Sequence, residues 1–175
     1  AKKYGNPIVF CVPSGNFGNL TAGLLAKRIG TPIHHFVAAN NANNVFTQYH
    51  HTALFNPRPS VTTLSNAMDV GNPSNLQRIQ DLYNNNVDAI RADISAYDYT
   101  DEQTVEAMKE VYEKYGYVMC PHTAVAYLGI NSYLSDHPNE DITGIFLSTA
   151  HPAKFLDIVE PALNISVELP ENLAK

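Results

Sequence analysis

The chain has 175 residues, of which 45% are hydrophobic and 16% charged, as in an ordinary globular domain with a trailing arm. The net charge of −6 and the absence of a Lys/Arg cluster argue against a nucleic-acid partner and an anionic membrane surface. No apolar run approaches the ~20 residues that a membrane helix needs. Cys11 and Cys120 form neither a disulfide framework nor a zinc-site spacing, so we expect two buried thiols in a cytoplasmic protein.

The first 40 residues read as strand, loop, helix and strand. Residues 8–13 form a continuous apolar run, which is typical of a buried strand in a parallel sheet. Residues 20–29 place leucine and isoleucine at helical spacing, and Gly30 ends the helix. Residues 33–39 form the second strand. This order predicts an α/β fold, a three-layer Rossmann-like domain with a mostly parallel sheet and helices on both faces. The strand order is left open.

The remaining elements are predicted from caps and apolar spacing. Thr100 and Gln103 form a capping box, which opens a helix that Gly116 closes. Asparagines 40–44 indicate a turn or the entry to a helix. The other predictions are helices over 74–83 and 122–134, helical turns over 152–159, a short strand over 117–120 and a buried strand over 144–147.

The polar turn over residues 14–19 lies where open α/β sheets bind ligands, between a strand and the start of a helix. Backbone N–H groups there can converge on a phosphate, and the helix dipole favours its negative charge. We expect Gly15 and Gly18 to permit close backbone approach and positive φ. The turn matches neither a dinucleotide fingerprint nor a Walker A loop. A plain strand-to-helix turn remains the alternative.

A second polar segment, residues 148–155, directly follows the strand predicted over 144–147. If both strands are parallel in one sheet, Ser148 and Thr149 lie at the same edge as the first turn. Their hydroxyls then face the same ligand. The alternative is that they cap the helix that follows Pro152.

Four segments together resemble the threonine synthase family in content and order, namely residues 13–24, 64–75, 121–127 and 148–155. That family belongs to the fold type II pyridoxal-phosphate (PLP) enzymes, like the tryptophan synthase β subunit. The resemblance implies conversion of O-phospho-L-homoserine and water to L-threonine and phosphate. It also implies that residues 1–163 are part of a PLP-binding large domain, and that 164–175 form a C-terminal extension.

Carried over by position, the resemblance assigns two groups of cofactor-binding residues and no metal ligand. The backbone amides of the first group hold the PLP phosphate, and the hydroxyl of Thr149 bonds the pyridine nitrogen. A neutral hydroxyl does not stabilise the protonated form of the pyridine nitrogen. The PLP ring therefore withdraws electrons less strongly than it would beside a carboxylate. The first group consists of Gly15, Asn16, Phe17, Gly18 and Asn19.

The chain departs from the family pattern at the lysine that forms the Schiff base. The family carries it in an S-F-K-D-like segment upstream of the phosphate loop, and this sequence contains no such segment. The family's small domain has no counterpart here either. We therefore expect the chain to need the missing N-terminal part of the same protein and to be inactive alone. Asn44 also stands where family members often have aspartate.

Two other readings of the function stay open. One is a different fold type II PLP enzyme, a dehydratase or a cysteine synthase, although these usually have a phosphate loop richer in glycine. The other is a phosphate-binding domain without catalysis. The roles of several polar residues are also open, between ligand contact and a cap, core or surface position: His50, His51, Asp69, His122, His151 and Lys154.

Overall fold

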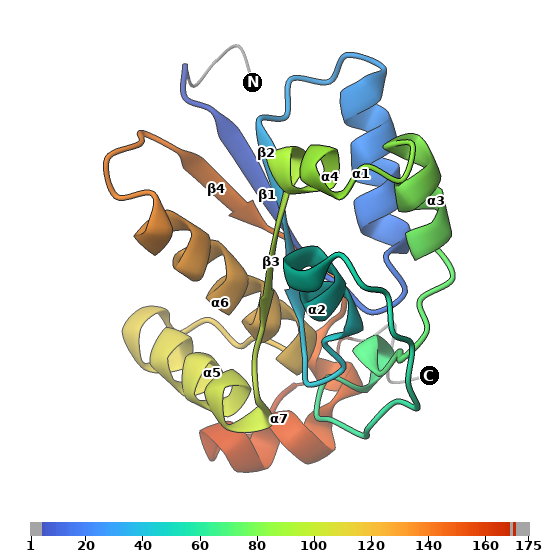
Figure 1. Ribbon diagram of the computed structural model, residues 1–175. Helices are drawn as coiled ribbons and strands as arrows, with labels where there is room; N and C mark the ends of the chain where they lie inside the picture. The colour runs from blue at the N-terminus through green and yellow to red at the C-terminus, as the bar shows by residue number, and fades with distance from the viewer. Residues whose placement is uncertain (1–4, 169, 171–175) are drawn as a thin grey trace.

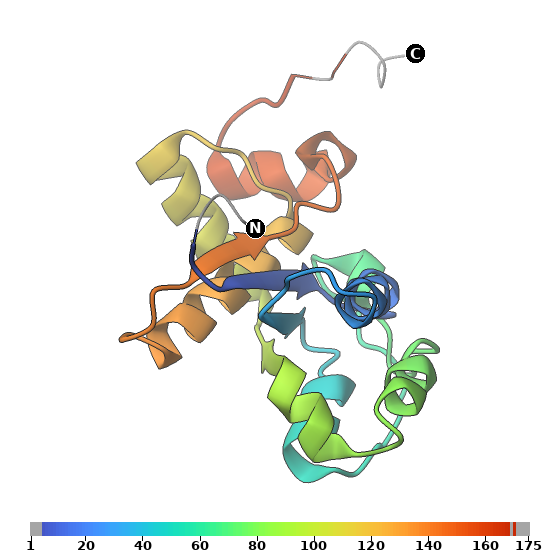
Figure 2. The same cartoon turned by 90° about the horizontal axis from the view of Figure 1, so that it is seen from above.

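The computed structural model describes residues 5–168 and 170, and these build one parallel sheet between two layers of helices (Figures 1 and 2). The strand order is β3-β2-β1-β4, and all three neighbouring pairs are parallel. The strands are β1 (Ile8–Pro13), β2 (His35–Asn40), β3 (Ile94–Asp98) and β4 (Thr143–Phe146). The predicted α/β class and sandwiched sheet are confirmed.

The two central strands explain the continuous apolar runs of the sequence. In β1, Val9 and Cys11 pack on one face with Val125 of α6 (Pro121–Asp136), while Val12 packs on the other face with Leu20 of α1 (Gly18–Arg28). Both faces of β1 are therefore shielded from water, and each residue along it needs an apolar side chain.

The helices divide between the two faces of the sheet (Figure 2). On one face lie α6, α5 (Asp101–Tyr115) and α7 (Leu156–Leu163), and on the other lie α1, α2 (Val45–Thr52), α3 (Leu76–Leu82) and α4 (Val87–Asp93). Two short 3-10 turns, η1 (Asn66–Met68) and η2 (Pro152–Lys154), complete the described elements. No helix in residues 5–168 is both long and apolar enough to cross a membrane.

The local signals for α5 and the two thiols are confirmed. The Thr100 hydroxyl accepts the backbone N–H of Gln103, and the Thr100 backbone N–H donates in return to the Gln103 side chain. Gly116 ends the helix at φ 65°. Both Cys11 and Cys120 are buried free thiols. Helix α7 ends at Leu163; of the predicted extension over 164–175, residues 169 and 171–175 lie outside the described part.

Three predictions about strands were wrong or incomplete. Residues 117–120 form no strand, because this extended segment has no neighbouring strand to pair with and only leads into α6. The strand β4 exists, but it is only partly buried instead of buried, because it lies at the edge of the sheet. Strand β3 was not predicted, since its sequence Ile-Ser-Ala-Tyr-Asp lacks a long apolar run.

The pairing of β1 with β4 brings the two predicted site segments to one edge of the sheet. Since β1 and β4 are parallel neighbours, their carboxyl ends lie at the same edge of the sheet. The register pairs Cys11 with Phe146, so residues 14–19 and residues 147–150 leave the sheet side by side. Among the described residues β4 pairs with β1 alone, which leaves its other side without a strand.

Candidate functional site

The turn after β1 is held at its base by buried polar groups. The backbone N–H of Ser14 donates to the carbonyl oxygen of Ala39 at 2.8 Å, and the Asn40 side chain donates to the Ser14 carbonyl at 2.7 Å. The Ser14 hydroxyl in turn donates to the carbonyl of Val12. These bonds tie the turn to β2, so residues 15–19 start from a rigid edge of the sheet.

Phe17 shapes the turn by adopting the left-handed conformation, with φ 62° and ψ 16° at the start of α1. This conformation is uncommon for a residue other than glycine. Packing supports it, because the Phe17 ring is buried and its centroid lies 4.7 Å from that of Phe46. No side chain caps α1, and no acceptor in the described part of the chain bonds the amides of residues 15–19. The helix therefore presents free N–H groups to a ligand.

For the two glycines of the turn, the prediction of positive φ was wrong, while close approach of backbones holds for Gly15. Neither has positive φ, because Phe17 takes that conformation instead. A Cβ on Gly15 would lie 2.6 Å from the Cα of Met68, so Gly15 is required by close packing of two backbones. A Cβ on Gly18 would meet only the Asn75 side chain, at 3.9 Å, on the open side of the turn. Unlike Gly15, Gly18 is therefore not required by packing.

Thr149 faces the same space from the end of β4. Its segment is tied to the start of α6, because the hydroxyls of Ser148 and Thr123 are 3.1 Å apart. The predicted capping alternative is wrong for both Ser148 and Thr149, since the residue that caps η2 is His151, whose Nδ1 accepts the N–H of Ala153. Of the two roles left open for His151, the structure shows the cap.

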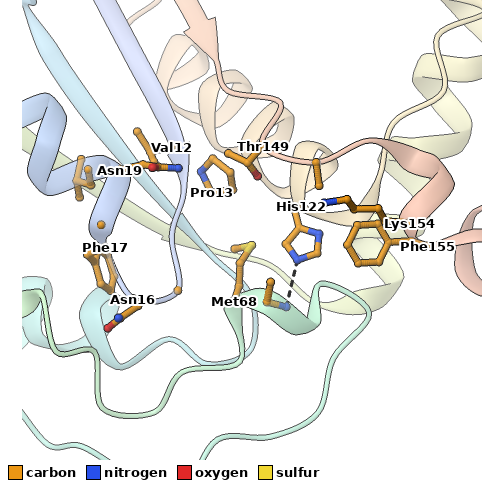
Figure 3. Close-up of a pocket in the computed structure, with 15 residues that line it drawn as sticks. Val12, Pro13, Asn16, Phe17, Asn19, Met68, His122, Thr149, Lys154 and Phe155 are labelled. Atoms are coloured by element: carbon orange, nitrogen blue, oxygen red, sulfur yellow. Dashed lines mark hydrogen bonds between the residues drawn. The ribbon is translucent and has the colours of Figure 1, made fainter. Parts of the chain in front are cut away.

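A cavity of about 410 Å³ joins the two predicted groups (Figure 3). Its walls include Gly15, Asn16, Phe17, Gly18 and Asn19 from the turn and Thr149 from the opposite segment. The expectation that both groups lie at one edge of the sheet is therefore confirmed. The other lining residues are Val12, Pro13, Leu20, Ala67, Met68, His122, Ala150, Lys154 and Phe155.

The groups that line the cavity favour a negatively charged ligand. The cavity is bordered by free backbone amides, the Lys154 ammonium, the Thr149 hydroxyl and the His122 ring, and none of the described residues in its wall is a carboxylate. Amides at a helix N-terminus and a nearby ammonium both favour negative charge. The cavity therefore suits a ligand that brings anionic oxygens and further hydrogen-bond acceptors.

His122 enters this cavity from the first turn of α6 and is buried, so it combines two of the roles that the sequence leaves open, a core position and a place beside the ligand site. Its Nε2 accepts the N–H of Ala67 at 3.2 Å, and its ring centroid lies 4.8 Å from that of Phe155. Burial lowers the pKa of His122, against a smaller opposite effect from Asp69. The ring is therefore neutral near pH 7.

Asp69 does not line the cavity but holds the segment that does. Its Oδ1 accepts hydrogen bonds from the side chains of Asn41 at 2.9 Å, Asn43 at 3.0 Å and Thr63 at 2.6 Å. Its Oδ2 accepts the backbone N–H of Thr63. This half-buried cluster positions Met68 and its neighbours over the turn. The sequence reading had weighed a helix cap or ligand contact instead.

The paired histidines lie away from the cavity. His50 belongs to α2 and is half-buried, with its Nε2 2.8 Å from the carbonyl of Ile94. Burial lowers its pKa. The expectation of exposed loop histidines was therefore wrong for His50, while His51 is exposed at the end of the same helix. Asn44 starts α2 and bonds Asp98.

The family described as "Pyridoxal-phosphate dependent enzyme" matches residues 1–148 of the chain. This chain belongs to that family. The family described as "Threonine synthase, C-terminal" matches residues 123–175. Threonine synthase from Haemophilus influenzae is 44% identical over 174 residues, which are 99% of this chain and 40% of that protein. The resemblance seen in the sequence is confirmed.

Solved structures of threonine synthases have the same fold as this chain. The crystal structure of threonine synthase from Escherichia coli superposes with a TM-score of 0.87 at 41% identity, over 99% of this chain and 39% of that one. The PLP-bound threonine synthase from Brucella melitensis gives 0.87 at 28% identity, over 97% and 41%. The chain thus spans about 40% of the length of these relatives. A tomato threonine deaminase, at 18% identity and TM-score 0.59, shares the fold alone.

Proposed function

We propose that this chain forms the phosphate-binding side of the PLP site in a threonine synthase. The whole enzyme would convert O-phospho-L-homoserine and water to L-threonine and phosphate. One observation carries the proposal: the free amides of residues 15–19 and the hydroxyl of Thr149 border the same cavity. The identity to threonine synthases over nearly the whole chain supports it. Residues 1–163 form the large-domain part of the proposal, with 164–175 as its extension.

The residues present fit PLP. The amides of Gly15 to Asn19 would bind its phosphate, since these residues line the cavity and the dipole of α1 favours a dianion. Thr149 would donate its hydroxyl to the pyridine nitrogen across the cavity. PLP supplies the electron sink for the reaction when it is bound. Among the described residues of the wall, no carboxylate would stabilise a protonated ring nitrogen.

The proposal assigns no catalytic residue within this chain. In the described part of the cavity wall, Lys154 is the single lysine, and it comes from the turn after Thr149. We propose instead that the cofactor's lysine lies upstream of the phosphate turn, as the resemblance to threonine synthases implies. We therefore propose that these 175 residues alone bind PLP reversibly and do not turn over the substrate.

The experiment titrates the 175-residue chain with PLP and follows binding by absorbance and calorimetry. Saturable binding at one site is expected, and no pyridoxyl adduct should remain after borohydride reduction and mass spectrometry. Failure to bind PLP overturns the proposal of a phosphate cradle. Phosphate release from O-phospho-L-homoserine by the chain alone, or a stable adduct at Lys154, overturns the assignment of catalysis to residues outside it.

A further inference from the structure

The His122 ring is held in one protonation form by its surroundings. Because Nε2 accepts the Ala67 N–H, it carries no proton, and the neutral ring must carry its proton on Nδ1. The side chain is only 3% exposed, so solvent does not compete for this arrangement. His122 therefore offers one fixed N–H donor.

That donor has no partner. Nδ1 is buried and makes no hydrogen bond to any described residue. A buried N–H without an acceptor destabilises the folded state, so such groups are rare in folded proteins. Figure 3 shows the nitrogen that is not bonded to Ala67 on the side of the ring toward Lys154 and Phe155, which line the same cavity. Lys154 and Thr149 also line the cavity, and neither bonds this nitrogen.

The position of His122 at the N-terminus of α6 also favours a hydrogen-bond acceptor on the ligand. It is the second residue of a 16-residue helix that has no side-chain cap, so the positive end of α6 also borders the cavity. The cavity thus lies between the N-termini of α1 and α6. A ligand with its phosphate at α1 and an acceptor atom on its other end would satisfy both.

We propose that His122 is a ligand-binding residue that donates its Nδ1–H to the oxygen atom on C3 of the pyridine ring of PLP, since Thr149 is assigned to the ring nitrogen. This inference rests on the proposed function, because it requires the phosphate to lie at residues 15–19. The Phe155 ring borders the donor, and its side chain has to turn aside for the contact to form. The amide of Ala67 acts as a positioning group that fixes the tautomer.

Two substitutions of His122 test the roles of its two ring nitrogens separately. The variant His122→Gln keeps an acceptor near the Nε2 position for the Ala67 amide but removes the donor at Nδ1. The variant His122→Asn keeps a donor near the Nδ1 position but is too short to reach Ala67. If His122 binds the ligand, His122→Gln should weaken PLP binding about tenfold with little change in Tm, since a hydrogen bond to a charged acceptor is worth about that factor. His122→Asn should lower Tm more and PLP affinity less.

Phenyl phosphate serves as the matched probe, because it has the phosphate and an aromatic ring but no acceptor on the ring. Its affinity should be the same for the unaltered chain and for His122→Gln. Equal loss of both ligands in His122→Gln, or unchanged PLP binding, overturns the inference and leaves His122 with the structural contact to Phe155 and Ala67. If the unaltered chain binds phenyl phosphate and His122→Gln binds PLP normally, the phosphate-binding proposal holds but the role of His122 is wrong. If the unaltered chain binds neither PLP nor phenyl phosphate, the proposed function is wrong as well.

Discussion

The backbone N–H of Leu147 donates to the carbonyl oxygen of Cys11 at 3.0 Å, one residue beyond the last register pair of β4 and β1. This bond extends the alignment of the two strands to the point where both chains leave the sheet. It therefore sets Thr149 opposite the turn of residues 15–19, on two sides of one cavity. Segments more than a hundred residues apart in sequence come together through one pair of parallel strands.

The two glycines of the turn can be tested separately. Gly18→Ala should weaken binding of PLP and phenyl phosphate by roughly tenfold, because the added methyl group enters the space before the amides. Tm should stay the same or rise slightly, since alanine is the better helix former. Gly15→Ala should lower stability by about 2 kcal/mol, because its methyl group meets the Met68 backbone. Calorimetry of both variants checks this; normal ligand affinity in a folded Gly18→Ala would contradict it.

Thr149 can be tested by removing its hydroxyl and keeping its shape. Thr149→Val should weaken PLP binding about fivefold, the usual effect of one neutral hydrogen bond, while Thr149→Ser should stay near the unaltered value. Both variants should bind phenyl phosphate normally, because that ligand has no ring nitrogen. Since Thr149 is exposed at the cavity wall, neither change should alter Tm greatly. Equal PLP affinity of the valine and serine variants would remove Thr149 from the site.

Asp69→Asn should destabilise the chain by about 2 kcal/mol. Oδ1 accepts from the side chains of Asn41, Asn43 and Thr63, and Oδ2 accepts the Thr63 backbone N–H, so the new amide would set its own N–H groups against at least one of these donors in either orientation. Chemical denaturation gives the free energy of unfolding. Asp141→Asn, at an exposed carboxylate, is the control and should change it little. Similar values for the two variants would show that the cluster does not hold the segment.

Asp93 predicts a pH dependence of stability. Burial alone would raise the pKa of Asp93, but hydrogen bonds from Lys27 and Tyr83, each 2.7 Å long, outweigh burial and hold that pKa below its usual value. A depressed pKa stabilises the fold above the unfolded value of about 4, and this contribution is lost as the pH falls through the folded value. Asp93→Asn should thus cost about 1 kcal/mol at pH 7 and nothing at the lowest pH.

The control for Asp93 lies in the same helix. Asp88 pairs with Arg91, but its side chain is 87% exposed, so Asp88→Asn should change stability little at any pH. Urea denaturation of both variants between pH 3 and pH 7 provides the measurement. A difference between Asp93→Asn and the unaltered chain that persists unchanged at pH 3 would contradict the assigned pKa.

The sequence predicted those parts that depend on local patterns. The apolar run of β1 and the capping box at Thr100 each act within a few residues, and both were confirmed. The parts that failed depend on distant partners. The Asp69 cluster draws on residues 41–65, and the fixed tautomer of His122 depends on an amide 55 residues away. Likewise, positive φ fell on Phe17 instead of a glycine, because packing against Phe46 supports it.

The open side of β4 affects how the chain behaves in solution. Its backbone N–H and C=O groups on that side can pair with any extended segment, including the same strand of another molecule. Self-association should therefore grow with protein concentration, and light scattering would detect it. The variant Ile145→Lys, on this edge, should keep the chain monomeric by charge repulsion. Ligand titrations would then report binding to the monomer alone.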